Sequence, residues 1–219
     1  ADPAKRAERA RQIIAFLETN KMQGLTVDFE TVPPSAQKDL LAFLGELSAE
    51  FDKRNWVLLV CVPFNDENWN YKAYADVADF VVLMAYDEHW EEGAPGSIAG
   101  QDWFEALLDK RMKELDPDQT IIAIGNYGYN WSEGKPAEDL TFQEAMQAAQ
   151  DSEADIDFDE DAENPHFTYK EDGVKHDVWF LDAVTSFNQI HAADIYKPYG
   201  YALWRLGSED PSIWSVMGR

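Results

Sequence analysis

The chain has 219 residues, the size of one domain or a large part of one, and its 45% hydrophobic content is enough for a packed core. A formal net charge of -24 repels phosphate groups and anionic lipid, so we expect no nucleic-acid partner and no membrane contact from this chain. No run of about twenty apolar residues is present, which argues against a membrane-spanning helix.

Cysteine and histidine usage argues against redox and metal chemistry. The single cysteine, Cys61, excludes a disulfide within the chain and lies in an apolar run, which favours a buried structural thiol over a nucleophile. The four histidines lack metal-ligand spacing, so we predict neither a metal site nor a cofactor. The sequence opens Ala1-Asp2-Pro3 without methionine or a signal-peptide pattern, and we interpret it as part of a longer protein.

Helices and strands are predicted to alternate along the chain. A helical pattern over 3–20 is followed by a strand over 25–29 and a helix over 35–51. The alternation continues with strands over 56–62, 79–86, 120–125 and 200–204 and with helices near 71–77, 101–115 and 185–196. Such alternation indicates a parallel sheet, and five strands fit a barrel or a doubly wound sheet.

One insertion interrupts this alternation between Tyr127 and Ala183. It contains a predicted helix over 141–150, the acidic run 151–163, which we interpret as a solvated surface segment, and two β-rich arms around Lys170-Glu-Asp-Gly173. That tetrapeptide predicts a hairpin. We therefore divide the chain into a main domain, 1–126 and 184–219, and an inserted α+β subdomain, 127–183.

Polar and aromatic residues end the predicted strands. In a parallel barrel the active site lies at the carboxyl ends of the strands, which makes these residues candidates for a site. In strand order they are Asp28 and Glu30, then Tyr86, Asp87 and His89, then Tyr127, and finally Trp204.

Asp28 and Glu30 are two residues apart, so on a strand both side chains point to the same face. Two carboxyl groups that close do not both ionise cheaply, and the protonated one is suited to donate a proton to a glycosidic oxygen. The alternative is an ordinary acidic surface loop. No second acid ends the strand over 120–125, a gap that fits a substrate which supplies its own nucleophile, although Asp87 remains available as the partner acid.

Three segments resemble the family-18 glycoside hydrolases, the chitinase-like group. They are Gly24-Leu-Thr-Val-Asp-Phe-Glu30, Val81-Val-Leu-Met-Ala-Tyr-Asp87 and Gly200-Tyr-Ala-Leu-Trp-Arg-Leu-Gly207. The insertion is similar to that of the spore-germination, peptidoglycan-cleaving branch. The chain is more similar still to the hydrolase-like domain between a polysaccharide deacetylase module and a family-2 glycosyltransferase in some bacterial proteins.

This resemblance implies a (β/α)8 TIM barrel and a role for each matching residue. Glu30 is the implied proton donor, and Asp28 orients the substrate's 2-acetamido group and stabilises positive charge. Tyr86 hydrogen-bonds the acetamido oxygen, Asp87 helps to bind the sugar, and Trp204 forms the floor under it. We expect Tyr127 and His89 to contribute to substrate binding from the same rim.

The chain departs from the family pattern in two respects. The motif Asp-x-x-Asp-x-Asp-x-Glu has Gln23 and Thr26 at its first two acidic positions, so a charge relay to Asp28 is missing. The five predicted strands correspond to the fourth through eighth of a barrel. We therefore expect either further N-terminal strands on another segment or association with a second copy.

The implied function is hydrolysis of β-1,4-linked N-acetylglucosamine glycans, chitin-like or peptidoglycan, by a retaining, substrate-assisted mechanism. The implied location is extracellular or at a bacterial cell surface, including within a membrane-anchored multidomain protein. Two alternatives remain open: a non-catalytic glycan-binding module and a glycan-processing domain of a polysaccharide synthase.

Overall fold

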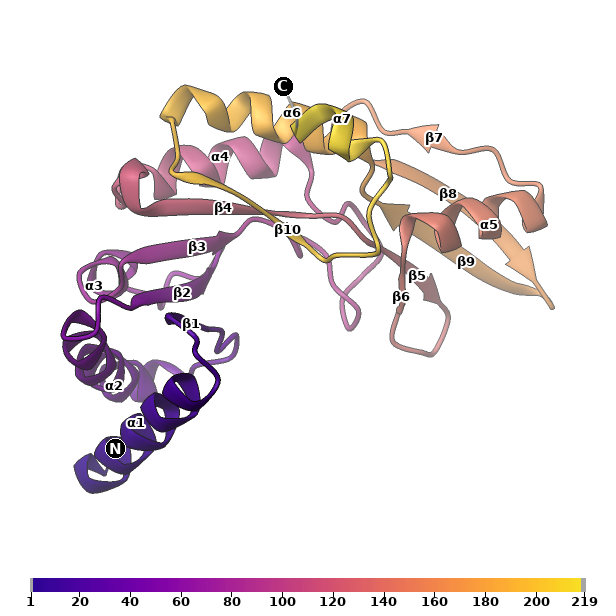
Figure 1. The fold of residues 1–219 in the computed structure, drawn as a ribbon. Helices are drawn as coiled ribbons and strands as arrows, with labels where there is room; N and C mark the ends of the chain where they lie inside the picture. The colour runs from indigo at the N-terminus through magenta and orange to yellow at the C-terminus, as the bar shows by residue number, and fades with distance from the viewer. Residues whose placement is uncertain (1, 218–219) are drawn as a thin grey trace. The chain divides into compact units, whose positions relative to one another are not determined.

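The computed structural model describes residues 2–217 (Figure 1). The helices are α1 Pro3–Thr19, α2 Pro34–Asp52, α3 Tyr71–Ala75, α4 Gln101–Arg111, α5 Phe142–Ser152, α6 Ala183–Ala193 and α7 Ile213–Met217, with short 3-10 turns η1 Pro117–Gln119 and η2 Asp194–Tyr196. The strands are β1 Gly24–Val27, β2 Val57–Pro63, β3 Phe80–Met84, β4 Thr120–Gly125, β5 Gly128–Ser132, β6 Glu138–Leu140, β7 Asp157–Phe158, β8 Pro165–Glu171, β9 Val174–Phe180 and β10 Gly200–Trp204.

The chain divides into two compact units. The first comprises the residues up to Met84 together with Lys110–Ile122 and Pro198–Gly200. The second comprises Ala85–Asp109, Ala123–Lys197 and the residues from Tyr201 onward. One sheet has the strand order β1-β2-β3-β4-β10, and β2 pairs in parallel with both β1 and β3.

In the first unit, helix α2 packs against α1 and against one face of β2 (Figure 1). The buried side chains follow the period of each element. They are Leu44, Leu47 and Phe51 on α2, three and four residues apart, and Leu58, Val60 and Val62 on β2, two residues apart. Burial of such side chains supplies most of the stability of a helix on a sheet, about 1.5–3 kcal/mol for each. An ion pair of 3.0 Å between Arg6 and Glu46 also links α1 to α2.

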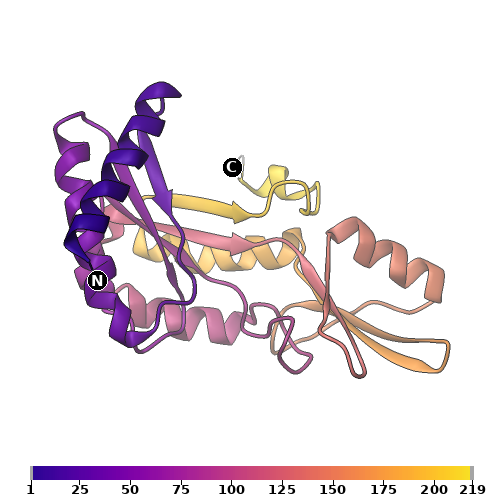
Figure 2. The same ribbon diagram turned by 90° about the horizontal axis from the view of Figure 1, so that it is seen from below.

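The second unit contains an antiparallel sheet with the order β6-β5-β9-β8-β7. Helix α5 lies along one face of this sheet (Figure 2), where Ala145 and Ala149 pack against Phe167, Val178 and Phe180. A capping box starts α5: the Thr141 hydroxyl accepts from the Glu144 amide, and the Glu144 carboxylate accepts from the Thr141 amide.

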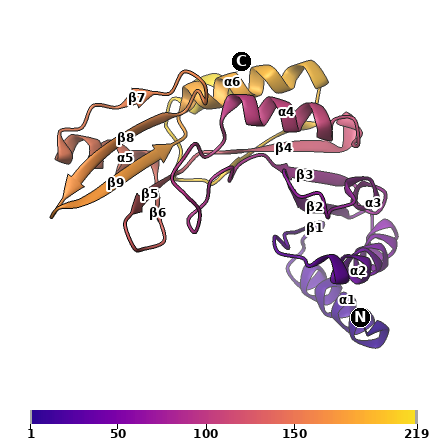
Figure 3. The same cartoon turned by 180° about the vertical axis from the view of Figure 1, so that it is seen from behind.

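Helices α4 and α6 of this unit lie side by side along β4 (Figures 1 and 3). The Gln101 amide donates to the Asn188 carbonyl at 3.5 Å, and the Tyr196 hydroxyl just after α6 donates to Asp109 at 3.2 Å. These two bonds link α4 to α6 and to the η2 turn that follows it.

The predicted helices and strands of the main domain are all present, with shifts of a few residues at their ends. Helix α4 ends at Arg111, four residues before the predicted Leu115, and the hairpin is confirmed as β8 and β9. Strands β5, β6 and β7 and helix α7 were not predicted. The domain boundary at 127 and 183 stays a prediction. No helix within residues 2–217 is long and apolar enough to cross a membrane.

Candidate active site

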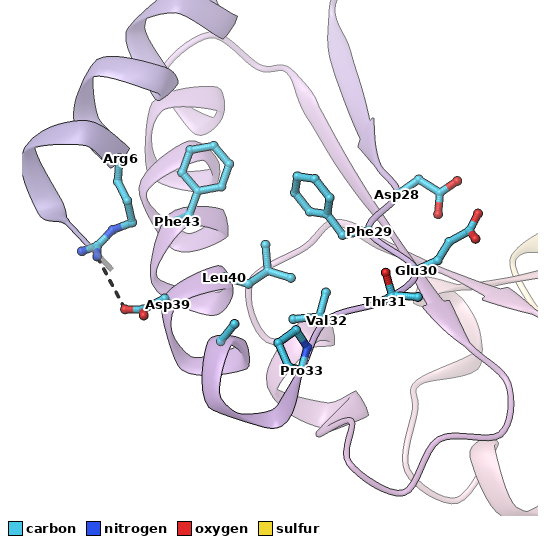
Figure 4. A pocket seen from close by; sticks show the side chains of 11 residues that line it. Arg6, Asp28, Phe29, Glu30, Thr31, Val32, Pro33, Asp39, Leu40 and Phe43 are labelled. Atoms are coloured by element: carbon cyan, nitrogen blue, oxygen red, sulfur yellow. Dashed lines mark ion pairs between the residues drawn. The ribbon is translucent and has the colours of Figure 1, made fainter.

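Asp28 and Glu30 follow directly after β1 in the first unit and are both exposed. Figure 4 shows their carboxyl groups pointing to the same side of the chain, while the ring of Phe29 between them points to the other side, toward Phe43. The extended backbone after β1 thus continues the strand's alternation, which places two carboxyl groups next to each other.

A pocket of about 580 Å³ borders this segment (Figure 4). Its wall is largely apolar and is formed by Phe29, Val32, Pro33, Leu40 and Phe43. Asp28 and Glu30 border the pocket, but their carboxyl groups point away from Leu40 and Phe43. We therefore do not assign a sugar to this pocket, because the reacting groups face elsewhere.

A thiol accompanies the two carboxylates on the neighbouring strand. Cys61 of β2 is 8% exposed, and the Asp28 carboxylate lies near enough to its thiol to affect the pKa of that thiol. Burial, then the charge and hydrogen bond of Asp28, and finally the charge of Glu30 raise the pKa of Cys61 to about 12. The thiol is therefore protonated at neutral pH, which excludes it as a nucleophile and keeps it a donor.

In the second unit, a row of aromatic rings surrounds Asp87. The Tyr86 and Tyr127 ring centroids are 6.0 Å apart, and those of Tyr127 and Tyr129 are 5.4 Å apart, both edge to face. Gly125 permits this packing, since a Cβ there would lie 3.1 Å from both the Tyr86 Cβ and the Tyr127 ring.

Asp87 accepts hydrogen bonds on Oδ1 from the Tyr127 hydroxyl and, at 3.4 Å, from the Tyr129 hydroxyl. Loss of water around the carboxyl raises the pKa of Asp87, the two tyrosine hydroxyls lower it, and the charges of Asp139 and Glu91 raise it again, with a net rise. Burial, followed by the charge of Asp87, raises the pKa of Tyr127, so this hydroxyl remains a donor.

His89 and Trp204 occupy different positions in the second unit. The Nδ1 atom of His89 lies 2.8 Å from the Ser97 carbonyl oxygen, so this histidine is held by its own loop. Trp204 ends β10 and is 47% exposed, and its carbonyl accepts from the Asn126 amide at 2.8 Å. This bond places the end of β10 beside the end of β4, where Tyr127 follows.

The structure thus brings the candidate residues together in two sets. Asp28 and Glu30 form one set in the first unit, and Tyr86, Asp87 and Tyr127 form the other in the second unit. Sequence reasoning missed the contact of Cys61 with Asp28 and did not single out Tyr129 as a donor to Asp87. The period of two from Tyr127 was the signal for the latter, whereas the former depends on the register of β1 against β2, for which the sequence carries no local signal. Among residues 2–217 no group of three or more potential ligands could hold a metal ion.

Comparison with known proteins shows relatives over almost the whole chain. The chain is 29% identical to an uncharacterized glycosylase of Bacillus subtilis, YvbX, over 94% of this chain and 63% of that protein. It is 26% identical to a cortical fragment-lytic enzyme of Bacillus anthracis, over 94% of this chain and 51% of the relative. The chain therefore spans about half to two thirds of the length of these curated relatives.

Solved structures show the same fold. The Bacillus cereus spore cortex-lytic enzyme SleL superposes with a TM-score of 0.89 at 25% identity, over 99% of this chain and 53% of that one. The five-stranded parallel sheet is accordingly part of a TIM-barrel-like fold, as the resemblance to family 18 implied. The sequence profile of the Glycosyl hydrolases family 18 matches residues 1–209. The chain belongs to the glycosyl hydrolases of family 18.

Proposed function

We propose that this chain carries the proton donor and the acetamido-binding groups of a retaining glycosidase that cleaves β-1,4-linked N-acetylglucosamine glycans. The observation that carries the proposal is the pair Asp28 and Glu30, whose carboxyl groups point to one side after β1 in a chain of this family. A carboxylic acid beside a carboxylate is the minimum that substrate-assisted hydrolysis requires of the protein.

The reaction proceeds in two steps. In the first, Glu30 gives its proton to the glycosidic oxygen, the bond from that oxygen to the anomeric carbon breaks, and the acetamido carbonyl oxygen of the substrate attacks that carbon. Asp28 orients the acetamido group and stabilises the positive charge that develops on it. In the second step a water molecule gives a proton back to Glu30 and attacks the anomeric carbon. This attack opens the oxazolinium ring that the acetamido group formed in the first step, and the configuration at the anomeric carbon is retained overall.

The other candidate residues are proposed as sugar-binding groups, in keeping with the family to which the chain belongs. Tyr86 donates to the acetamido oxygen, Asp87 and Tyr127 bind sugar hydroxyls, and the exposed indole of Trp204 stacks under the apolar face of the sugar. Asp87 is suited to this role because two tyrosine hydroxyls fix its carboxylate. His89 is a less suitable contact, since its Nδ1 is engaged by Ser97.

The retained Glu30 favours catalysis over a non-catalytic glycan-binding module, because a binding module has no use for a proton donor. A glycan-processing role within a polysaccharide synthase would place the same chemistry beside other domains, and it is distinguished by what flanks the chain. We propose chitin-like glycan or peptidoglycan as the substrate, in keeping with the cortical fragment-lytic relatives, and a site of action outside the cell membrane, where such polymers lie.

Glu30→Gln tests the proposal. This change keeps the size of the side chain and removes the transferable proton, so we expect the release of reducing ends to fall by about 100-fold or more. The assay measures reducing ends from N-acetylglucosamine oligomers and from purified peptidoglycan over long incubations. Glu171→Gln, at the end of β8, is the matched control and is expected to retain the wild-type rate. Hydrolysis by Glu30→Gln at the wild-type rate would contradict the assignment.

A further inference from the structure

The segment after β10 is held in place by its main chain. The Trp204 carbonyl accepts from the Asn126 amide at 2.8 Å, directly after β4. The next carbonyl, that of Arg205, accepts from the Ser208 hydroxyl at 2.9 Å and from the Ser208 amide at 3.3 Å. Ser208 is 0% exposed, and its own carbonyl accepts from the Phe142 amide at 2.9 Å, where α5 begins. The main chain at and after Trp204 is therefore fastened both to β4 and to the start of α5.

The side chain of Arg205 adds an ion pair to a different element. Its Nη2 atom lies 2.6 Å from Oδ2 of Asp139 in β6. Arg205 is the residue directly after the last residue of β10, and Asp139 belongs to the antiparallel sheet of the second unit. The pair therefore attaches the end of β10 to that sheet through side chains, in addition to the main-chain bonds.

The pairing of β5 with β6 relates this ion pair to the Asp87 carboxylate. Tyr129 is directly opposite Asp139 in the antiparallel register, so the two side chains lie on the same face of the sheet. The Tyr129 hydroxyl donates to Asp87 Oδ1 at 3.4 Å. An unbroken series of bonded or paired residues therefore lies within the second unit, and its members in order are Trp204, Arg205, Asp139, Tyr129 and Asp87.

A half-exposed arginine beside a stacking indole has two conceivable roles. It binds an anionic group of the glycan directly, or it fixes the strand end that carries the indole. The ion pair favours the second role, because a guanidinium already paired with Asp139 offers a ligand little net charge. The direct role also leaves the link to β6 without a purpose in binding.

We propose that Arg205 is a positioning residue: its ion pair with Asp139 holds the end of β10 so that the Trp204 indole is oriented for stacking on the sugar. This inference rests on the proposed function, in which Trp204 stacks under the sugar and Asp87 binds its hydroxyls. An indole that is already held in place loses less freedom when the sugar binds, so the ion pair favours binding. Arg205 does not touch the glycan in this proposal and acts only through Trp204.

The first experiment follows the Trp204 indole without any need for catalysis. The chain has eight tryptophans, and incorporation of fluorotryptophan gives each of them a fluorine NMR signal. The Trp204 signal is identified by its loss in Trp204→Phe. Asp139→Asn is expected to shift or broaden this signal, because the ion pair transmits the change through Arg205, and to leave most of the others in place.

Lys72→Gln is the matched control for the NMR experiment. It removes one charge from another exposed ion pair, 3.1 Å from Asp76 and within the first unit, and is expected to leave the Trp204 signal unchanged. Arg205→Lys keeps a cation within reach of Asp139 and should give a Trp204 signal close to the native one. A Trp204 signal that Asp139→Asn does not alter would overturn the positioning role.

The second experiment tests the consequence for binding and catalysis. Arg205→Gln and Asp139→Asn are each expected to raise KM for N-acetylglucosamine oligomers by about two- to fivefold, the effect of one partly exposed ion pair. The value of kcat should change less, because the indole stacks on the sugar in the ground state and in the transition state alike. The double variant should show the loss of one single variant and not the product of both, and Arg205→Lys should recover most of the native KM.

The outcomes separate the two proposals. A native chain that hydrolyses neither N-acetylglucosamine oligomers nor peptidoglycan contradicts the proposed function, and the NMR series still decides whether the ion pair positions Trp204. An active native chain in which Asp139→Asn keeps the native KM overturns the positioning role and leaves the proposed function standing. A KM that rises in Arg205→Gln but not in Asp139→Asn also overturns it, because Arg205 would then bind the glycan directly.

Discussion

At the scale of single residues, the environment of Asp87 shows how opposing effects determine the pKa of one carboxyl group. Asp87 has a backbone φ of 61°, a left-handed conformation that aspartate tolerates better than most residues. Loss of water around its carboxyl raises the pKa, whereas the hydroxyls of Tyr127 and Tyr129 lower it. The tyrosine donors therefore oppose the effect of lost water and favour the ionised form of Asp87, which can accept from a sugar hydroxyl.

Tyr127→Phe is expected to destabilise the folded chain at neutral pH by about 1 kcal/mol, at the low end for a bond to a charged group because Asp87 is an exposed residue. The change raises the pKa of Asp87 further above its ordinary value of 3.8. An acid whose pKa is raised in the folded state contributes to the free energy of unfolding below its ordinary pKa. This contribution is lost as the pH rises through the pKa of the folded state. The loss of folding stability caused by Tyr127→Phe should therefore be smaller at about pH 4 than at neutral pH.

Urea unfolding followed by tryptophan fluorescence, at neutral pH and at about pH 4, measures this difference. Tyr129→Phe is the matched control, since its hydroxyl is 3.4 Å from the same oxygen and the smaller bond should give a smaller loss. A loss for Tyr127→Phe that is the same at both pH values would contradict the assigned link to Asp87.

Whether the arrangement of two residues could be predicted from the sequence depended on how far apart they lie along the chain. That Asp28 and Glu30 point to one side could be predicted because the period of a strand is two, and Figure 4 bears this out. The partnership of Cys61 with Asp28 could not, because it depends on the register of β1 against β2, which no local pattern fixes when the helix between them is 19 residues long.

At the scale of elements, β5 and β9 approach each other closely at Gly128. A Cβ at Gly128 would lie 2.5 Å from the Phe180 Cβ and 2.7 Å from the Trp179 carbonyl oxygen. The close approach brings the aromatic residues of β5 and β9 into one sheet, with Tyr129 opposite Trp179. Only glycine permits this spacing, because backbone atoms of a paired strand cannot move aside.

Gly128→Ala is accordingly expected to destabilise the chain by about 2–4 kcal/mol, through overpacking and separation of β5 from β9. Gly45→Ala, in the middle of α2 with no atom within 4 Å of the added Cβ, is the matched control and is expected to stabilise by about 0.5–1 kcal/mol. Thermal unfolding of both variants measures the contrast. Equal midpoints for the two would contradict the close approach at Gly128.

Strand β5 also shows why some elements could not be predicted from the sequence. The hairpin of β8 and β9 was predictable because its turn is local, around Asp172 and Gly173. Strand β5 has only five residues, two of them Gly128 and Asn130, and it exists as a strand through pairing with β9, more than forty residues later. Local propensity does not indicate a strand whose stability comes from so distant a partner.

At the scale of the whole molecule, the net negative charge and the edge of the sheet have opposite effects on self-association. Strand β1 is the first strand in the order of its sheet and pairs with β2. Phe16, Met22 and Phe29, before and after β1, are 59%, 47% and 53% exposed. An edge strand with exposed apolar neighbours favours association with another chain, whereas a net charge of -24 disfavours it.

We expect the 219-residue chain by itself to associate in a salt-dependent manner and to be only weakly active. Screening shortens the range of repulsion from about 14 Å at 0.05 M salt to about 4 Å at 0.5 M, so association should strengthen with salt. Sedimentation velocity at several protein concentrations measures it. Phe29→Ser should weaken the association, whereas Ile195→Ser, which removes a 74% exposed side chain of η2, should not. A preparation that stays monomeric at high salt and is fully active would contradict this expectation, because it would show that the edge of β1 does not matter to the chain.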